Sequence, residues 1–475
     1  MSPAPRASLP SAPKHLPRLG VGAIVAALLA GCALPGKQTA RAAPGESERY
    51  EPAAITPTEE PAPYFALAGE PFCFAGANNY YLSYKSQAAV LDVLEAAAAM
   101  DLRVLRLWGF LDRGSLDGAV RDVHGTGHKD GVHFQHWDPK KKRPAYNDGP
   151  DGLGRLDFVL HHARRLGLKL IVVLTNNWRD FGGMDQYLVW YGLDRHHLFF
   201  TDRRVKRAYK DWVHHLLHRV NALDGVPYRE DPAVFAWELA NEPRALNFED
   251  FDDARGWDGM TITRWADEMS AFVKSIAPHH MVAVGDEGFL DGGRDHWAYE
   301  APYGVDHEAL TALPHVDFGT YHLYPDHWGT DDGWGVRWIE DHLAVARRLG
   351  KPTVLEEYGV HVERAGDISG PITRGWRRRE AAYDDWNRAV LLGGGAGALF
   401  WILSGIERPG ELYPDYDHFT VYRGDESSRL LQGFAKRFRS EARACTLAQG
   451  ADHGEPSPFV QARPAPTSLR VGAHE

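Results

Sequence analysis

The chain has 475 residues, of which 44% are hydrophobic and 25% charged, so it can build a large core and is not a disordered protein. Its formal net charge is −11, and its short basic run Lys140–Arg143 is interpreted as a solvated loop, so no nucleic-acid partner is expected.

The first 32 residues are interpreted as a targeting segment rather than part of a fold. Arg6, Lys14 and Arg18 form a basic leader, and the apolar run over 19–30 is too short to span a bilayer comfortably. The run ends in the letters LAGC at Cys32, which resembles a bacterial lipoprotein signal. That resemblance implies export, lipidation of Cys32 and anchoring in a bacterial cell envelope. In the alternative, an ordinary secretory signal, the cysteine is incidental.

Three further stretches complete the expected domain plan. Residues 33–63 are rich in Ala, Pro, Glu and Thr and predict a flexible tether, residues 64–446 a catalytic domain, and residues 447–475 an irregular tail. Cys73 and Cys445 could form a disulfide in an oxidising compartment, although Cys73 lies in an apolar run that also suits a buried thiol. No Cys/His spacing predicts a zinc site.

The domain alternates strand and helix patterns. In chain order we expect a strand at 72–77, a helix at 88–100, strands at 103–108 and 169–174, a helix after Asp202 to about 220, a strand at 234–240, a helix at 262–276, strands at 281–284 and 316–321, a helix at 338–349, a strand at 353–356, a helix at 381–392 and a strand at 398–402. The third strand is nearly all aliphatic, which is typical of a parallel strand buried on both faces.

Eight such strands predict a (β/α)8 TIM barrel in a single catalytic domain. The rival is a doubly wound open sheet, which would place a Gly-rich phosphate turn after its first strand, and Gly76–Asn79 is not one. Long loops at about 111–152, 178–200 and 287–312 follow strand ends, where they would surround the active face of a barrel.

Two carboxylates stand at strand ends. Glu242 follows the fourth strand and Glu357 ends the seventh. Cleavage of a glycosidic bond needs one acid that protonates the leaving oxygen and one carboxylate that attacks the sugar carbon. The acid needs a pKa raised by burial or by a nearby negative charge, whereas the nucleophile must stay ionised.

Other residues around these strand ends fit supporting roles. Arg106 lies inside the apolar second strand and needs an anion partner, and Tyr324, after the sixth strand, could donate its hydroxyl to Glu357. Glu356 should point to the opposite side of its strand from Glu357 and is interpreted as a structural ion partner.

Eight motifs resemble, in order, those of glycoside hydrolase family 5 in clan A, and most closely its endo-β-1,4-mannanase branch. They are LRLWGF at 105–110, NNW at 176–178, FFTD at 199–202, FAWELANEPR at 235–244, GDEG at 285–288, DFGTYHLYPD at 317–326, EEYG at 356–359 and FW at 400–401. They extend over about residues 65–440 of the chain.

The resemblance implies a retaining hydrolase of β-1,4-mannosidic bonds in mannan-type polysaccharides or manno-oligosaccharides. Glu242 would be the acid/base and Glu357 the nucleophile, with no metal or organic cofactor. Substrate-binding roles are implied for Arg106, Trp108, Trp178, Asn241, Arg244, Glu287, His322, Tyr324, Trp328 and Trp401.

Within that set the resemblance implies different tasks. Arg106 and Tyr324 would hold Glu357, Asn241 would bind the 2-hydroxyl of the reacting sugar, and His322 would complete the hydrogen-bonded shell. Trp401 would floor the subsite where the bond breaks. The other three tryptophans would stack on further sugars, and Arg244 and Glu287 would bind on the leaving-group side.

Several alternatives stay open. The substrate could instead be a β-1,4-glucan or another family 5 substrate, or the chain could be a surface lipoprotein that binds polysaccharide without cutting it. Ile402 and Leu403 stand where polar residues are common in the family, and a long insertion over 136–149 leaves exo versus endo cleavage undecided. We expect a monomer.

Overall fold

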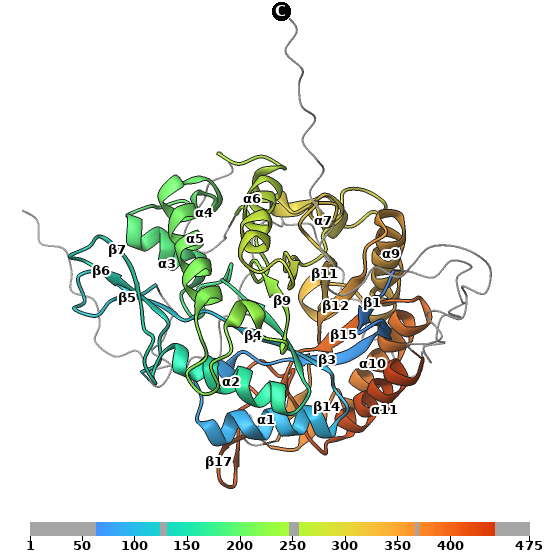
Figure 1. Ribbon diagram of the computed structural model, residues 1–475. Helices are drawn as coiled ribbons and strands as arrows, with labels where there is room; N and C mark the ends of the chain where they lie inside the picture. Colours follow the sequence, from blue (N-terminus) through green and yellow to red (C-terminus); the bar gives the residue numbers. More distant parts are fainter. Residues whose placement is uncertain (1–62, 124–130, 247–255, 366–369, 442–475) are drawn as a thin grey trace, which may run out of the picture. The chain divides into compact units, whose positions relative to one another are not determined.

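The computed structural model describes residues 63–123, 131–246, 256–365 and 370–441. Within them, eight parallel strands form one sheet in the order β10-β9-β8-β4-β3-β15-β12-β11 (Figure 1). The strands are β3 (Phe74–Asn78), β4 (Val104–Trp108), β8 (Lys169–Val173), β9 (Val234–Glu238), β10 (Met281–Ala283), β11 (Gly319–Leu323), β12 (Thr353–Tyr358) and β15 (Gly397–Phe400). This is the (β/α)8 barrel that the sequence predicts.

The two ends of the sheet order, β10 and β11, are joined through Asp317. Its backbone N–H donates to the carbonyl of Val282 at 2.8 Å, and its carboxylate accepts from the Val282 N–H at 2.6 Å. Lys274 lies 2.7 Å from the same carboxylate. The sequence predicts that the sixth strand begins at residue 316, but β11 begins at Gly319 because Asp317 pairs with β10 through its side chain.

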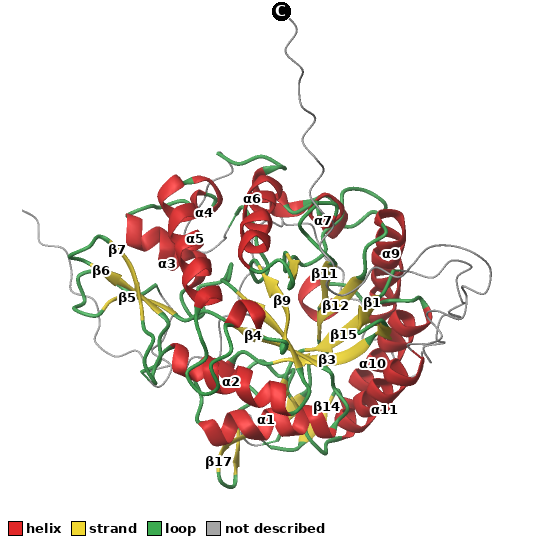
Figure 2. Ribbon diagram, viewed as in Figure 1, coloured by secondary structure: helices red, strands yellow, loops and turns green. Residues whose placement is uncertain are grey.

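The expected helices are confirmed and lie outside the strands (Figure 2). They are α1 (Gln87–Ala99), α5 (Arg203–His218), α6 (Thr261–Ile276), α9 (Asp332–Leu349) and α10 (Trp376–Leu392). Asp202 caps α5 as predicted, since its side chain accepts from the N–H groups of Arg204 and Val205. No helix among the described residues combines the length and the apolarity that a membrane span requires.

Other helices lie outside the segments for which the sequence predicts a helix. They are α2 (Leu153–Arg165), α3 (Gly183–Tyr191), α4 (Leu198–Thr201), α7 (His307–Thr311), α8 (Pro325–Trp328) and α11 (Glu426–Glu441), with 3-10 turns η1 (Tyr81–Ser83), η2 (Tyr228–Glu230), η3 (Trp297–Tyr299) and η4 (Pro302–Gly304). Two of the three long loops after strand ends therefore contain short helices of their own.

Small sheets decorate the barrel. They are β1 (Phe65–Leu67) with β2 (Glu70–Phe72), β5 (Asp112–Ser115) with β6 (Gln135–Asp138) and β7 (Arg143–Tyr146), β13 (Glu363–Arg364) with β14 (Ile372–Arg374), β16 (Leu403–Ser404) with β19 (Val421–Tyr422), and β17 (Ile406–Arg408) with β18 (Glu411–Leu412). The expected first strand is thus divided between β2 and β3. Lys140, Lys141 and Lys142 lie in the exposed turn between β6 and β7, as predicted, and Arg143, also exposed, begins β7.

Aromatic side chains fill the amino-terminal end of the barrel. Phe65, from the β1–β2 hairpin, packs edge-on against Phe235 at 5.0 Å and Phe318 at 5.3 Å, and Phe74 lies 5.4 Å from Phe235. These residues belong to a buried apolar cluster built from the starts of the strands. Because this end is closed by packing, a polar site must lie at the carboxyl-terminal end.

The expected lipidation residue Cys32, the leader, most of the tether, Cys445 and the tail lie outside the described residues. Cys73 is described and is buried.

Candidate active site

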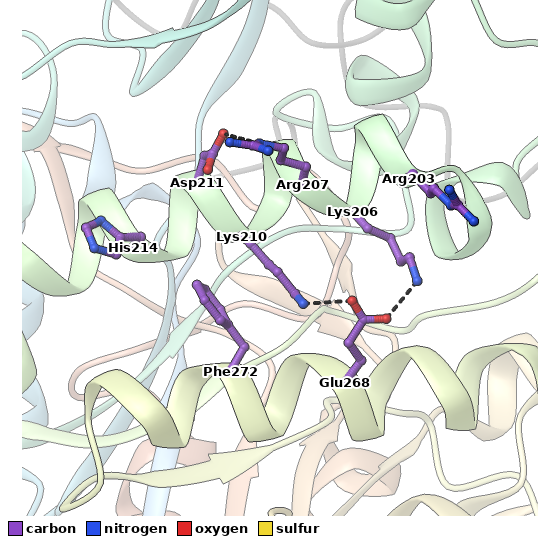
Figure 3. Close-up of a pocket in the computed structure, with 8 residues that line it drawn as sticks. All are labelled: Arg203, Lys206, Arg207, Lys210, Asp211, His214, Glu268 and Phe272. Carbon is purple, nitrogen blue, oxygen red and sulfur yellow. Dashed lines mark hydrogen bonds and ion pairs between the residues drawn. The ribbon is translucent and has the colours of Figure 1, made fainter.

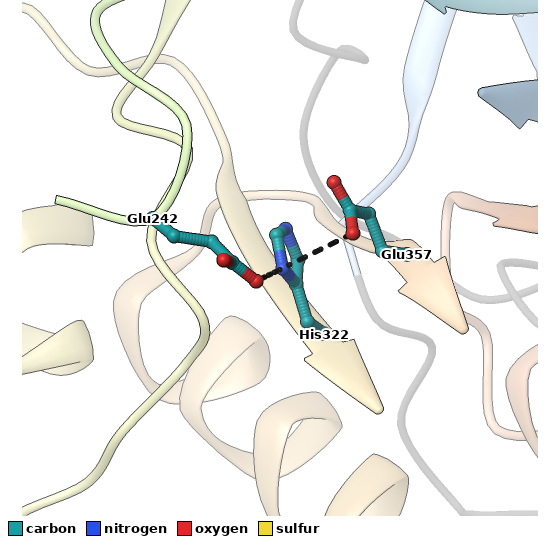
Figure 4. A group of neighbouring side chains, drawn as sticks. All are labelled: Glu242, His322 and Glu357. Carbon is teal, nitrogen blue, oxygen red and sulfur yellow. Dashed lines mark hydrogen bonds and ion pairs between the residues drawn. The ribbon is translucent and has the colours of Figure 1, made fainter. Parts of the chain in front are cut away.

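Glu242 and Glu357 lie at the carboxyl-terminal ends of β9 and β12, and their side chains point toward one another with His322 between them (Figure 4). One oxygen of each carboxylate lies within 4.8 Å of the other. Carboxyl groups about 5–5.5 Å apart belong to retaining glycosidases, whereas inverting enzymes keep them about 6.5–9.5 Å apart. The two strand-end carboxylates therefore lie at the same end of the barrel, at a separation that fits the retaining class.

Glu242 is held at the end of β9 by its backbone and by two side-chain donors. Its φ of 49° is left-handed, and its N–H donates to the carbonyl of Gly285 at 2.8 Å. The carboxylate accepts from Nδ1 of His322 at 2.7 Å and from Nε1 of Trp178. The acid is thus fixed from two sides.

The electrostatics of Glu242 differ from the sequence expectation. Burial raises its pKa, but the hydrogen bond and charge of His322, the charge of Arg244 and the hydrogen bond from Trp178 outweigh burial and lower the pKa to about 2. His322 in turn has a pKa well above its usual value; burial lowers it, and the surrounding carboxylates more than compensate. These two shifts favour a proton on His322 over one on Glu242, its hydrogen-bond partner.

Glu357 is surrounded by the donors that a nucleophilic carboxylate needs. Arg106 Nη1 and the Tyr324 hydroxyl both donate to it, the latter at 2.7 Å, as the sequence predicts. Burial and the charge of Glu242 nevertheless raise its pKa, against the lowering effects of His322, Arg106 and Tyr324. Glu357 is ionised once the pH exceeds that raised value.

Arg106 is fully buried and connects the site to the barrel interior. Two of its hydrogen bonds, at 2.8 and 2.6 Å, go to Glu238, and others go to Asn241 at 2.6 Å and Asn78 at 3.1 Å. The anion partner expected for Arg106 is therefore Glu238 as well as Glu357. Burial, together with the charge of Glu356, raises the pKa of Glu238 well above its usual range despite Arg106.

Asn241 is oriented for one further contact. Its amide oxygen accepts from Arg106, and its amide nitrogen donates to Asn176 at 3.0 Å. Because an amide nitrogen carries two hydrogens, one N–H remains for a ligand hydroxyl.

Arg244 and Glu287 form a second buried ion pair beside Glu242. Two hydrogen bonds of 2.7 Å join them, and the Arg244 guanidinium lies over the rings of Trp178 at 5.0 Å and Tyr303 at 4.6 Å. Burial and the charge of Glu242 raise the pKa of Glu287 to about 7, although Arg244 opposes this. The leaving-group role that the resemblance implies for this pair stays a prediction.

Trp401 follows β15 and keeps part of its surface exposed. Its Nε1 donates to Asp417 at 2.7 Å, and its ring is parallel to that of Tyr80 at 5.8 Å. Its polar partner therefore comes from the loop between β18 and β19.

Trp108 and Trp328 require a correction, because the sequence interpretation has them stacking on sugars. They are only 4% and 8% exposed. Trp108 packs against Trp401 at 6.0 Å, with the Arg106 guanidinium 5.1 Å from its ring. Trp328 packs among other aromatic residues, including Trp338 at 5.6 Å. Both support the site from within rather than present a face to a ligand.

Sequence reasoning missed Asn78, Glu238, Asn176 and Asp417. Asn78 and Glu238 carry a usable signal, since each is a polar residue within or at the end of a buried strand. Asn176 lies in one of the quoted motifs but was given no role. Asp417 has no signal, because its loop shows neither strand nor helix periodicity.

The same three side chains, Glu242, His322 and Glu357, are the one group within the described ranges whose ligand atoms would suit a metal ion. Their surroundings argue for a different use. The carboxylate oxygens already accept from Trp178, His322, Arg106 and Tyr324, and Arg106 is a permanent positive charge. The donor set fits an acid and nucleophile pair.

A hollow of about 470 Å³ lies elsewhere, between α5 and α6 on the outside of the barrel (Figure 3). Lys206 and Lys210 both bond to Glu268 there, each at 2.7 Å. It contains none of the carboxylates of the site and is not part of it.

A family model described as "GH family 5 beta-mannosidase-like" matches residues 63–443. Mannan endo-1,4-beta-mannosidase A of Podospora anserina is 32% identical over 368 residues, which cover 77% of this chain and 87% of that protein. The probable mannan endo-1,4-beta-mannosidase C of Aspergillus terreus is 38% identical over 331 residues, covering 66% and 78%.

Two solved mannanase structures are also similar to this chain. The endo-1,4-beta-mannanase of Rhizomucor miehei is similar with a TM-score of 0.70 and 34% identity, covering 80% of this chain and 98% of that one. The endo-beta-1,4-mannanase of Thermotoga petrophila is similar with a TM-score of 0.66 and 40% identity, covering 77% of each chain.

Proposed function

The chain belongs to glycoside hydrolase family 5, in its β-mannosidase-like group, and we propose that it hydrolyses β-1,4-mannosidic bonds in mannan-type polysaccharides or manno-oligosaccharides with retention of configuration. This proposal rests mainly on the carboxylate pair Glu242 and Glu357, whose nearest oxygens lie within 4.8 Å of one another. Relatives that share this chain's barrel along most of its length are named as mannanases.

In the first half of the reaction Glu357 attacks the anomeric carbon. The bond from that carbon to Glu357 forms while the glycosidic bond breaks, and Glu242 gives its proton to the departing oxygen. Arg106 and Tyr324 hold the attacking carboxylate in place. Glu242 takes this proton from His322 across their 2.7 Å hydrogen bond, so the step leaves Glu242 as a carboxylate and His322 neutral.

In the second half Glu242 is a carboxylate and acts as the base. It takes a proton from water, the water oxygen bonds to the anomeric carbon, and Glu357 leaves as a carboxylate. The proton returns from Glu242 to His322 across the same hydrogen bond, so the cycle ends in the protonation state in which it began. The free N–H of Asn241 is available for the 2-hydroxyl, and the exposed part of Trp401 for the apolar face of the ring.

Hydrolysis of purified linear β-1,4-mannan and of cellulose at equal mass tests this proposal. Release of reducing ends from mannan, with β-configured initial products by NMR, is expected. Faster release from cellulose would favour the β-1,4-glucanase alternative, no release from either would favour the non-catalytic binding alternative, and inverted products would overturn the mechanism. A product profile on linear manno-oligosaccharides separates exo from endo action.

We also propose, from the leader sequence, that the protein is exported and anchored in a bacterial cell envelope through a lipid on Cys32. We propose separately that it is a monomer. Expression in a bacterial host with labelled palmitate tests it. Label and membrane association are expected for the natural chain and should be lost in Cys32→Ser, and an unlabelled natural chain would contradict the proposal. Light scattering of the domain tests the monomer.

A further inference from the structure

Glu356, the neighbour of the nucleophile, does not point away from the site. Its carboxylate is fully buried, with Oε2 3.6 Å from Nε of Arg106 and 3.7 Å from Nε2 of His322. Strand alternation predicts the opposite side from Glu357. The sequence interpretation of Glu356 as a structural ion partner therefore needs to be extended.

A β-bulge explains the change of direction. Leu355 pairs with Tyr321, but the next pair is Glu357 with His322, so Glu356 has no partner in β11. The pairing of β12 with β15 also shifts between Leu355 and Tyr358. The extra residue turns both Glu356 and Glu357 toward Arg106, and bulges of this kind commonly re-aim side chains beside active sites.

Glu356 and the far nitrogen of His322 lack hydrogen-bond partners within the part of the chain that the structure describes. Both oxygens of Glu356 and Nε2 of His322 are buried without one. A buried, uncompensated carboxylate is costly, so its nearest positive groups must stabilise it. Those groups are Arg106 and the protonated ring of His322.

His322 thus lies between two carboxylates. Nδ1 donates to Glu242 at 2.7 Å on one side, and Nε2 lies 3.7 Å from Glu356 on the other. The main chain of His322 is fixed, because its carbonyl accepts from Trp338 Nε1 at 2.8 Å and its N–H donates to the backbone carbonyl of Glu287 at 3.1 Å.

We propose that Glu356 is a positioning residue that acts through His322, keeping a proton on the ring so that Glu242 can be reloaded as the acid. The other charged groups around the ring are Glu242 and Arg244 after β9, Glu287 after β10, Glu357 on β12 and Arg106 on β4. Glu238, at the end of β9, faces the Glu356 carboxylate itself. Glu356 is fully buried and lies 3.7 Å from Nε2, on the opposite side of the ring from Glu242. The inference rests on the proposed hydrolytic function.

The kinetic test compares Glu356→Gln with Glu308→Gln, the same change on a surface carboxylate paired with Arg348. Removing the negative charge behind His322 lowers the pH at which the shared proton leaves. The basic limb of kcat/KM on mannan should move down by about 1 pH unit, which is roughly a tenfold loss on that limb. Glu308→Gln should leave the basic limb in place. Glu356→Asp keeps the negative charge and should therefore move the limb less than Glu356→Gln does.

The second measurement does not depend on turnover. In protein labelled with 15N-histidine, the ring nitrogens of His322, assigned by their loss in His322→Gln, report its protonation. A doubly protonated ring at neutral pH is expected in the natural chain, with a lower pKa in Glu356→Gln. A neutral His322 at pH 6 in the natural chain, or an unmoved basic limb in a folded Glu356→Gln, overturns the inference. An inactive natural chain with the expected spectra would instead overturn the proposed function alone.

Discussion

Arg106 donates two hydrogen bonds to Glu238 but only one to Glu357. The group that orients the nucleophile is therefore itself positioned mainly by a carboxylate one layer deeper in the barrel. Arg106 has a pKa well above its usual value; burial lowers it, and Glu238, Glu356 and Glu357 outweigh that effect. The guanidinium stays charged at every pH of interest.

Glu238→Ala should therefore cost both stability and activity, although Glu238 does not face the substrate. Loss of one partner of a buried ion pair typically lowers the free energy of unfolding by about 3–5 kcal/mol. Urea unfolding and kcat on mannan measure the two effects. Glu238→Gln keeps acceptor capacity and should lose less of each. An Ala variant with natural stability and kcat would contradict this role.

Substituting the two catalytic carboxylates should give different patterns. Glu357→Ala should abolish turnover on every β-mannoside, because no covalent intermediate can form. Glu242→Ala should lower kcat on mannan by about 10²–10⁴-fold. The rate of the first half-reaction should fall much less on a dinitrophenyl β-mannobioside, because its leaving group needs no acid.

Burst kinetics with that dinitrophenyl substrate check the assignment. Accumulation of a glycosyl-enzyme in Glu242→Ala, and its absence in Glu357→Ala, is the expected result. Equal behaviour of the two variants on both substrates would contradict the division of roles. Circular dichroism controls for folding.

The acidic limb of the pH profile should report Glu357. Burial and the charge of Glu242 raise its pKa above the 4.5 of an ordinary glutamate. Since the nucleophile works only when ionised, kcat/KM should fall as the pH decreases through a value above 4.5. Tyr324→Phe removes a hydrogen bond to the ionised form and should move this limb to higher pH. A limb below 4.5 in the natural chain would contradict the prediction.

Gly285 should tolerate no side chain. Its φ is +87°, and a Cβ there would lie 2.1 Å from the Ala240 carbonyl oxygen and 2.2 Å from Oε1 of Glu238. Gly285→Ala should lower the free energy of unfolding and disturb the Glu238–Arg106 pair, so kcat should fall with it. Gly350→Ala is the matched control: its φ is +65° with nothing within 4 Å, and it should cost only about 1–2 kcal/mol of backbone strain. Equal losses would show that contact with Glu238 is unimportant.

Periodicity and strand-end chemistry are enough to predict the barrel and its two central carboxylates. Each buried strand has a recognisable run of apolar residues, and a carboxylate at its end has few uses. The direction of Glu356 could not be predicted, because one extra residue in a strand reverses the facing of its neighbours and leaves no mark in composition.

The protonation of Glu242 could not be predicted either. It depends on His322 and Trp178, which come from two other segments of the chain, and on Arg244, two residues further along. Likewise, the pairing of Trp401 with Asp417 crosses a loop with no repeating pattern, so proximity in space had no counterpart in the sequence.

The hairpin β1–β2 determines the end of the barrel at which the described chain begins. Phe65 seats this hairpin against the starts of the strands, so the chain joins the barrel at the end remote from Glu242 and Glu357. The amino-terminal hairpin therefore leaves uncovered the face of the barrel that carries Glu242 and Glu357.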